Sequence, residues 1–454
     1  MRLIKYSSTF SIAYILILLI LSILSAIQII KVEIGIYIYI FSIFGLCFLY
    51  SFLFKLSEDL FNKYFLLLVS IGIITKVFFS FNESLWEDDW ARYLWEGQLI
   101  KEGISPYQVS PIHFYQKVFD KNLESRGIEI LSRINHPEWT TIYFPIILFY
   151  FYLCAIISPY SFIILKIGYL LFDLLTLSLI SKLKNNKAGI LYFLFPILIK
   201  ETYINGHFEI ICIFLITLSF WLRKRNFINF SNLIFGLSVS SKPFLVFLFP
   251  FYLFTKIKYS NWRESFLKFL QFFLLCSIGF LFPFIFFQFM ISHNGLFGMT
   301  ELIKFANEFE FNPLFFYLFR LFLDYNHARY LSLFILVIFL LVTIYKNTII
   351  FENFENGIHW MFYSFLVYLI LTPIANPWYF LILVPLYFVS FPTLKKIWLI
   401  ICVPQMAYLT FTNLKLNNPI VNYGFYSLPY WVMLIELVAI INIMYHFKFS
   451  NNKK

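Results

Sequence analysis

The sequence predicts an all-α fold, that of a polytopic integral membrane protein with about 12–14 transmembrane helices. Hydrophobic residues make up 61% of the 454 residues, and charged residues make up only 13%. Apolar runs recur along the whole chain, and a helix needs about 20 such residues to cross a bilayer. Lys and Arg gather in the short segments between these runs, as is typical of cytoplasmic loops. We expect one transmembrane domain, residues 1–454.

The net charge of +11 does not indicate a nucleic-acid partner, because the basic residues are spread over short segments between apolar runs. These segments are "KLKNNK", "RKR", "TKIK", "LKK" and the terminal "SNNKK". They predict that both termini are cytoplasmic and that membrane lipids surround the helices between them. The cysteines stand singly in apolar segments, so the sequence implies neither a disulfide framework nor a thiolate metal site.

Three crossings are predicted before the first long loop, near 10–30, 34–54 and 65–81. The first run follows a basic start and is long enough to span, so we expect an uncleaved helix and not a signal peptide. The loop 82–142 then lies outside the cytoplasm, with short helices next to the membrane. It holds ten of the 24 acidic residues, and loops longer than about 15 residues are usually functional.

Beyond this loop, the apolar runs 143–158 and 161–181 lead to the basic segment "KLKNNK". Two full crossings would place that basic segment outside the cytoplasm, against the usual distribution of positive charge. We therefore expect 161–181 to cross and 143–158 to lie at or partly within the membrane. A tight cytoplasmic turn at "SPYS", between the two runs, is the alternative.

Two later segments begin and end at basic loops and are polar at their centres. Residues 189–222 contain "IKETYINGHFE", and residues 231–254 contain "SVSSKPF". The second segment is too short for two full helices, so we expect short helices that meet at polar breaks, as occurs where membrane proteins handle substrates. The breaks bring polar residues beneath the loop 82–142: Lys200, Glu201, His207, Glu209 and Lys242.

The remaining chain predicts regular helices near 266–290, 328–346, 358–372, 379–391, 397–413 and 430–447. A second outer loop, 291–327, carries Glu301, Glu308 and Glu310. Asp173 and Glu436 lie inside predicted helices, where we expect paired structural groups.

Glu87, Asp88 and Asp89 stand side by side at the start of the loop 82–142, among aromatic residues that include Trp95 and Tyr107. Neighbouring carboxylates repel one another, so the trio indicates a bound cation or a hydroxyl-bearing substrate. A carboxylate with a raised pKa could also accept a proton from an attacking hydroxyl. Indole and phenol rings stack well on sugars. A solvated acidic turn is the structural alternative.

Lys242 lies deeper in its segment than an ordinary surface lysine, and ionisable groups inside membrane segments are functional candidates. Lys200 is a weaker candidate because it could mark a helix end. Four further residues could either bind a ligand or cation or support the structure: His136, Glu138, His207 and Glu209.

The stretch "DWARYLWEGQLIKEGISPY" (89–107) resembles the first-loop motif of bacterial polytopic mannosyltransferases of the GT-C superfamily. That motif reads Asp-x-x-Arg-Tyr-x-Trp-Asp-Gly, followed by Gly-x-x-Pro-Tyr. The matching residues are Asp89, Arg92, Tyr93, Trp95, Gly97, Gly103, Pro106 and Tyr107, while Glu96 replaces an Asp. "INHPEWTTIYFP" (134–145), "NGHFE" (205–209), Lys242-Pro243 and "NPWY" (376–379) are similar to later pieces of the family pattern. Departures from that pattern occur at Phe144, Phe208 and Glu209.

The resemblance implies transfer of a hexose, usually mannose, from a polyprenyl-phosphate-linked donor to a glycan or lipid acceptor outside the cytoplasm, with inversion. It implies that Asp89 is the base and that Asp88 assists it or holds a cation. Three residues are expected to bind the donor phosphate: Arg92, Lys242 and Lys200. Candidates for sugar, acceptor or metal contacts are Glu87, His136, Glu138, His207, Glu209, Trp95 and Tyr107. A divalent cation such as Mg²⁺ or Mn²⁺ suits these carboxylates, and metal dependence is left open.

A transporter or flippase of a lipid-linked saccharide is the main alternative function. Such proteins commonly show inverted repeats and ionisable residues near the bilayer midplane. Here no internal repeat is visible, and the acidic residues concentrate in an outer loop. A non-catalytic membrane scaffold would leave Lys242 and the carboxylate trio without a role.

Overall fold

A computed structural model shows that the chain is helical, as its sequence predicts. The described residues are 2–29, 32–118, 125–249, 262–291, 300–309, 314–320, 322–347 and 354–390, together with Gln405. No β-strand occurs among them. Several predicted features lie outside the described residues: the helices near 397–413 and 430–447, Glu310, Glu436 and the C-terminal end.

The apolar segments of the first half form helices close to the predicted bounds. They are α1 (Arg2–Ala26), η1 (Ile27–Ile29), α2 (Val32–Lys55), α3 (Glu58–Lys63) and α4 (Phe65–Ser80). The loop 82–142 carries the three short helices α5 (Asp89–Lys101), α6 (Pro111–Val118) and α7 (Ser125–Ser132). The chain continues through α8 (Pro145–Ile157), α9 (Phe162–Leu183), α10 (Asn186–Phe193), α11 (Pro196–Ile199) and η2 (Lys200–Ile204).

The second half is equally helical. It comprises α12 (Glu209–Lys224), α13 (Ile228–Ser241), η3 (Pro243–Leu248), α15 (Trp262–Met290), α16 (Thr300–Glu308) and α17 (Leu314–Arg320). The last described elements are α18 (Tyr325–Asn347), α19 (Phe354–Leu371), η4 (Pro377–Ile382) and α20 (Leu383–Ser390).

Four of the described helices are long and apolar enough to cross a membrane. The qualifying stretches are Tyr37–Lys55, Phe162–Leu183, Phe266–Met290 and Tyr325–Val342. Five shorter apolar helices accompany them: Phe10–Ala26, Phe65–Ser80, Pro145–Ile157, Gly357–Leu371 and Pro377–Ser390. These lengths and compositions indicate a multi-pass membrane protein, and the number of 12–14 crossings stays a prediction.

The run 143–158 forms the short helix α8, whereas 161–181 forms the spanning-length helix α9. With 13 residues, α8 is about 20 Å long, which is less than the roughly 30 Å of a hydrocarbon core. The 22 residues of α9 would span it. α9 is therefore long enough to cross, and the expectation that 143–158 is an incomplete crossing stays a prediction.

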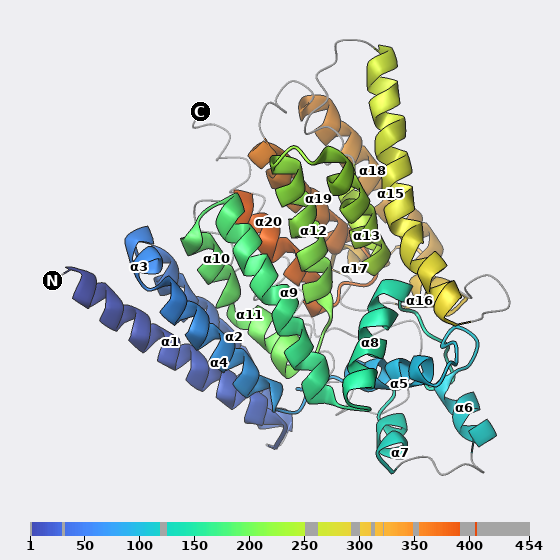
Figure 1. Ribbon diagram of the computed structural model, residues 1–454, viewed down its shortest axis with the longest axis horizontal. Helices are drawn as coiled ribbons and strands as arrows, with labels where there is room; N and C mark the ends of the chain where they lie inside the picture. Colours follow the sequence, from blue (N-terminus) through green and yellow to red (C-terminus); the bar gives the residue numbers. More distant parts are fainter. Residues whose placement is uncertain are drawn as a thin grey trace.

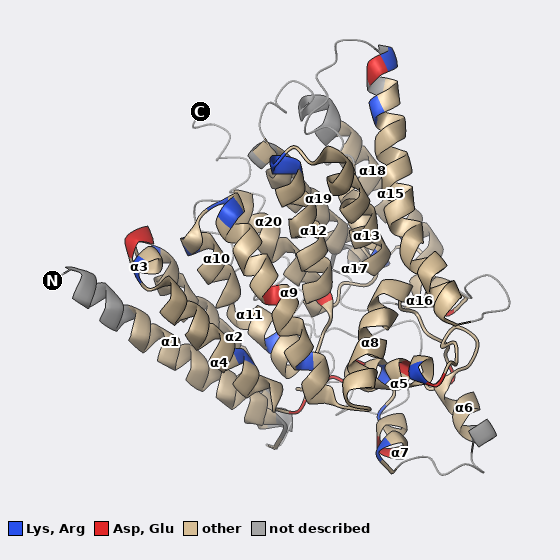
Figure 2. Cartoon of the chain, viewed as in Figure 1, with Lys and Arg blue, Asp and Glu red and all other residues tan. Residues whose placement is uncertain are grey.

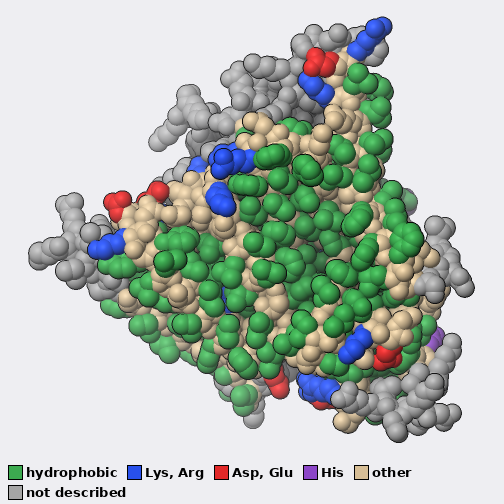
Figure 3. Space-filling view, in the orientation of Figure 1, with side chains coloured by type: hydrophobic (Ala, Val, Ile, Leu, Met, Phe, Trp, Pro, Cys, Tyr) green, Lys and Arg blue, Asp and Glu red, His purple; other side chains and the backbone are tan. Residues whose placement is uncertain are grey.

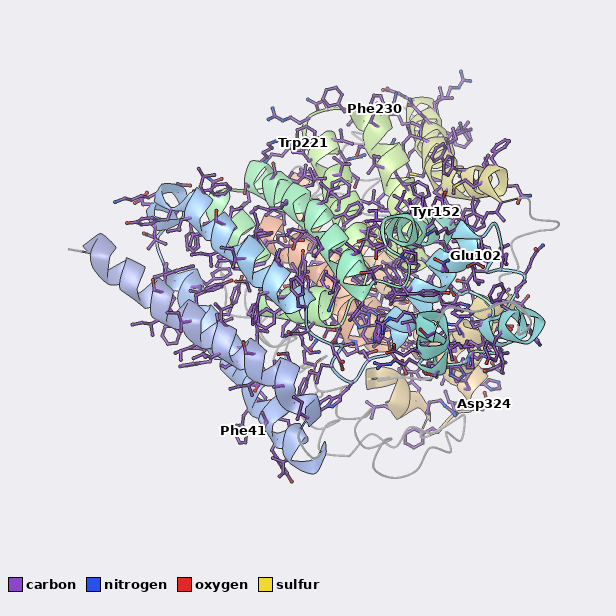
Figure 4. All side chains as sticks on the ribbon, turned by 60° about the horizontal axis from the view of Figure 1, so that its bottom comes forward. Phe41, Glu102, Tyr152, Trp221, Phe230 and Asp324 are labelled. Carbon is purple, nitrogen blue, oxygen red and sulfur yellow. The ribbon has the colours of Figure 1, made fainter. Side chains whose placement is uncertain are left out.

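The helices form a bundle with two chemically different ends (Figure 1). Helices α5, α6 and α7 lie at one end. The basic ends of α9 and α12 and the basic start of α15 lie at the opposite end (Figure 2). On the face shown in Figure 3, hydrophobic side chains cover most of the surface between these ends. Phe41 on α2 and Phe230 on α13 point outward (Figure 4), with 76% and 62% of their surface exposed. Such a belt suits lipid contact.

Both predicted polar breaks are present. After α11, the chain forms the π-helical turn η2 and then a bend at Gly206 before α12 begins. Gly206 has φ +85°, and a Cβ there would lie 2.4 Å from the Phe162 ring, so only glycine fits. At the second break α13 ends at Lys242, because Pro243 disfavours a helical conformation at the residue before it.

A buried ion pair joins α4 to α9 inside the bundle. The Lys76 ammonium contacts the Asp173 carboxylate, and both side chains are fully buried. The Tyr203 hydroxyl of η2 donates to the same carboxylate at 2.8 Å. This arrangement agrees with the expected pairing of Asp173 and fixes the π-helical turn against the two helices.

We expect Lys76→Met to lower the free energy of unfolding by about 3–5 kcal/mol, because it leaves the Asp173 charge buried without its partner. The double variant Lys76→Met/Asp173→Leu should recover most of that stability. Thermal unfolding of purified protein in detergent measures both effects. A single variant as stable as the wild type would show that the pair is dispensable.

Candidate functional site

The acidic trio lies where the chain enters α5. Trp86 has φ 57°, a left-handed conformation that reverses the chain just before the trio. Carboxylate oxygens of Glu87, Asp88 and Asp89 lie within 4.8 Å of one another. Glu87 is buried, Asp88 is exposed and Asp89 is half-buried. Asp89 occupies the first turn of α5, where the helix dipole stabilises negative charge.

Aromatic packing fixes α5 against the bundle. Trp90 stacks on Phe162 with ring centroids 4.6 Å apart, and Tyr93 stacks on Phe151 at 4.7 Å. Gly97 lets α5 approach α8 closely, because a Cβ there would lie 2.4 Å from the Phe151 carbonyl oxygen. The position of Asp89 is therefore set by a rigid helix and not by a free loop.

Trp95 and Tyr107 are buried inside the loop. Only 1% of Trp95 is exposed, and its ring lies edge-on to Phe114. The Tyr107 hydroxyl donates to the carbonyl oxygen of Tyr143 at 2.7 Å. These contacts support the loop, and sugar stacking by either ring stays a prediction.

Arg92 holds the second half of the loop through backbone carbonyls. Its guanidinium donates to the oxygens of Asn135 (3.0 Å), His136 (2.5 Å) and Trp139 (3.1 Å). Glu96 lies 3.4 Å from the same guanidinium. The observed partners of Arg92 are thus protein groups, and its expected phosphate contact stays a prediction.

Glu96, which replaces the Asp of the mannosyltransferase motif, also holds the loop in place. Its carboxylate accepts a 2.8 Å hydrogen bond from the Thr141 hydroxyl, and burial raises its pKa to about 7 against the opposing effect of Arg92. The longer side chain of Glu reaches Thr141 across the loop.

Lys242, at the end of α13, meets Glu209, the first residue of α12. The Lys242 Nζ lies 2.6 Å from the Glu209 Oε1, and the Glu209 side chain is fully buried. The ammonium also lies over the rings of Tyr379 and Phe208, at 4.1 Å and 4.7 Å from their centroids. The two polar breaks and the "NPWY" turn therefore converge on one cation.

Asp89 belongs to the same electrostatic environment. Burial is the largest cause that raises its pKa to about 7, and the nearby charge of Asp88 adds to it. The positive charge of Lys242 opposes this rise, while the negative charge of Glu209 increases it. The charges of Glu209 and Lys242 therefore both act on the loop aspartate.

Lys200 forms a second buried cluster beside the trio. Its ammonium lies 2.8 Å from the Glu201 Oε1 and 2.9 Å from the Gln405 Oε1. The Asn205 amide donates to the Glu201 Oε2 at 3.1 Å. Glu87 faces this cluster: burial raises its pKa, Asp89, Asp88 and Glu201 add to the rise, and Lys200 opposes it. Phosphate binding by Lys200 stays a prediction.

His207 is fully buried beside Glu201 of the Lys200 cluster. Its ring stacks on Trp378 with centroids 3.8 Å apart. Its Nε2 lies 3.8 Å from the Glu201 Oε2, and neither ring nitrogen has a hydrogen-bond partner among the described residues. The imidazole ties the "NPWY" turn to the Gly-His turn.

His136 and Glu138 lie apart from these clusters, at the outer surface of the loop. The His136 Nδ1 is 3.3 Å from the Glu138 Oε1, and the His136 ring stacks on Trp139 at 4.5 Å. The Lys304 ammonium of α16 lies 4.8 Å from the centroid of the Trp139 ring. These contacts hold the loop in place. Binding of an acceptor or a cation by His136 and Glu138 stays a prediction.

The trio suits a hard divalent cation by its donor atoms, because Mg²⁺ and Mn²⁺ prefer carboxylate oxygens. Glu87 would supply a buried oxygen, since its Oε1 has no hydrogen-bond partner among the described residues. Asp88 and Asp89 would complete the set.

A cavity of about 550 Å³ adjoins Lys242. Its walls come from the loop end at 142–144, the break after α13, and helices α16, α18 and α19. Most of the lining is apolar, and Lys242 and Tyr379 lie on its wall. Val246, Tyr330 and Leu333 line it and are also 48%, 67% and 50% exposed, so the cavity opens on the apolar surface of the bundle.

Sequence reasoning did not single out several residues that the structure places in or beside the site: Tyr379, Thr141, Arg329 and Ser332. Tyr379 had a signal in the "NPWY" stretch. Arg329 and Ser332 lie on the long apolar helix α18, where spacing alone does not show which neighbour a side chain faces.

Comparison of the chain with protein-family models, with curated proteins and with solved structures finds no match in any of the three. The resemblance to GT-C mannosyltransferases therefore stands on the motif residues named above.

Proposed function

We propose that the protein is a membrane glycosyltransferase that moves a hexose, mannose by resemblance, from a polyprenyl-phosphate donor to a glycan or lipid acceptor outside the cytoplasm. The Lys242–Glu209 ion pair at an apolar cavity, together with the effect of both charges on Asp89, carries this proposal. A lipid-linked donor needs an apolar space for its chain and a cation near its phosphate. The acceptor needs a base that it can reach from the water. Asp89 is half-buried, and its neighbour Asp88 is exposed.

The reaction is a single displacement with inversion. The acceptor oxygen attacks the anomeric carbon, the bond from that carbon to the phosphate oxygen breaks, and the acceptor proton passes to Asp89. The polyprenyl phosphate leaves with the additional negative charge. A cation near this oxygen lowers the barrier, because it stabilises the charge that grows in the transition state.

The raised pKa of Asp89 suits this role. A carboxylate whose pKa lies near 7 is a stronger base than an ordinary aspartate and is still ionised in a large fraction of molecules at neutral pH. Asp88 would assist by its charge or hold a cation. In this proposal the end of the bundle with α5–α7 faces away from the cytoplasm, and the basic helix ends opposite it face the cytoplasm.

The apolar cavity that opens on the lipid-facing surface is also compatible with the alternative, a transporter or flippase of a lipid-linked saccharide. One experiment separates the two. Purified protein in lipid vesicles receives polyprenyl phosphates carrying different radiolabelled hexoses, with a mixed glycan and glycolipid acceptor pool. A transferase cleaves the sugar–phosphate bond and yields free polyprenyl phosphate. Movement of intact donor across the bilayer without cleavage would reject the transferase in favour of the transporter.

A further inference from the structure

We infer that Arg329 and Ser332 of α18 form the anion-binding wall of the cavity and hold the phosphate of a single-chain lipid. This inference deepens the proposed function and rests on it for the identity of the lipid as a sugar carrier. The described lining of the cavity includes two charged side chains, Lys242 and Arg329, and both are cations. An anion is therefore the complementary ligand.

The two cations differ in how their charge is compensated. Lys242 is paired with the Glu209 carboxylate at 2.6 Å. Within the described chain, the Arg329 guanidinium donates to the side-chain oxygen of Asn307 on α16, which belongs to a neutral amide. No carboxylate within the described residues forms an ion pair with Arg329. Because Lys242 is already paired with Glu209, Arg329 is the cation of the described lining that has no carboxylate partner among the described residues.

Ser332 supplies a second and independent sign of a ligand. Its side chain is 5% exposed, lines the same cavity, and its Oγ has no hydrogen-bond partner in the described part of the chain. A buried hydroxyl without a partner costs free energy. Arg329 and Ser332 are three residues apart, so they lie on the same face of α18. A phosphate between them would accept hydrogen bonds from the guanidinium and the hydroxyl.

The shape and position of the cavity select the rest of the ligand. Leu333 and Leu336 continue the face of α18 that carries Arg329 and Ser332 along the cavity wall. The opening beside Val246 and Tyr330 leads to the lipid-facing surface. A volume of about 550 Å³ suits a phosphate and the first part of one apolar chain. The remainder of a long chain would extend along the outside of α18.

Equilibrium binding to the purified full chain in phosphatidylcholine nanodiscs tests the inference. The probe is an unglycosylated polyprenyl monophosphate, and the reference is the polyprenol of equal chain length. We expect the wild type to prefer the phosphate by about tenfold to a hundredfold, the gain expected from charged hydrogen bonds. Arg329→Gln should abolish this preference, Arg329→Lys should retain part of it, and Ser332→Ala should reduce it by about threefold to tenfold.

The matched control is Arg126→Gln, which removes an exposed cation of α7 that does not line the cavity; it should bind as the wild type does. Equal binding of phosphate and alcohol by the wild type, or an unchanged preference in folded Arg329→Gln and Arg329→Lys, would overturn the inference. Competition by phosphatidylglycerol as strong as that by polyprenyl phosphate would assign the wall to bulk phospholipid and also overturn it. Equally strong competition by inorganic phosphate would do the same, because the chain would contribute nothing.

Binding and transfer can fail separately. A protein that selects polyprenyl phosphate through Arg329 and cleaves no sugar donor would keep this inference and reject the proposed transferase. If the wild type transfers sugar and Arg329→Gln binds polyprenyl phosphate with unchanged affinity, the transferase is kept and this inference is rejected.

Discussion

Asp89→Asn is expected to lower the rate of sugar transfer by about a hundredfold to ten-thousandfold, the contribution of a general base. The amide keeps the size of the side chain and cannot accept the acceptor proton. The measurement is release of polyprenyl phosphate from a labelled donor by purified protein. Near-normal transfer by the Asn variant would remove Asp89 from the mechanism.

The stability of this variant separates loss of chemistry from loss of fold. The folded-state pKa of Asp89 is about 7, well above that of an unfolded aspartate, so folding favours the neutral form. The corresponding stability is present below the unfolded pKa and is lost as pH rises through about 7. At pH 8 the neutral Asn should therefore melt no lower than the wild type.

The matched control is Glu102→Gln. Glu102 is an exposed carboxylate at the other end of α5, hydrogen-bonded to Gln98 at 2.9 Å (Figure 4). This variant removes the same charge from the same helix and should keep both transfer and stability. Loss of transfer in Glu102→Gln would show that the rate depends on the total negative charge of the loop and not on a carboxylate at position 89.

Lys242→Met is the second change with a large expected effect. It leaves Glu209 buried without the cation 2.6 Å away, and removing one member of a buried pair costs about 3–5 kcal/mol of stability. Transfer should also fall strongly, because the cation beside the cavity is lost. Thermal unfolding and donor cleavage measure the two effects separately.

The double variant Lys242→Met/Glu209→Gln distinguishes a functional pair from a structural one. Its stability should return towards that of the wild type, because no uncompensated charge remains, while transfer should stay low. The equivalent double variant at the Lys76–Asp173 pair should recover transfer together with stability. Recovery of transfer at Lys242 and Glu209 would show that this pair only supports the fold.

The helix bounds could be predicted closely because apolar length decides them. α2 and α15, for example, match the predicted 34–54 and 266–290 within four residues at every end. The polar breaks could also be predicted, since Pro243 and the polar run before Gly206 are incompatible with a continuous lipid-exposed helix. Local chemistry is sufficient for these features.

The partners of individual side chains could not be predicted in the same way. Arg92 has the spacing to face Asp89 on a helix, and its guanidinium instead binds carbonyls 43–47 residues away along the chain. Arg329 and Ser332 acquire their cavity only through the packing of α18 against α19 and the position of α16 on the cavity wall. Such contacts depend on tertiary structure, which a single sequence does not display.

The pH dependence of transfer tests the central claim, that Asp89 is the base, most directly. The measured quantity is kcat/KM for donor cleavage, because its pH dependence reports the pKa values of the essential groups in the free enzyme. We predict that it rises with pH through a midpoint near 7, the pKa of Asp89. Glu96 also has a pKa near 7 and could produce the same midpoint. The control is therefore Glu96→Gln, which should keep the midpoint if Asp89 is the base. A profile that is flat from pH 5 to 8, or a midpoint that disappears in Glu96→Gln, would contradict the assignment of Asp89 as the base.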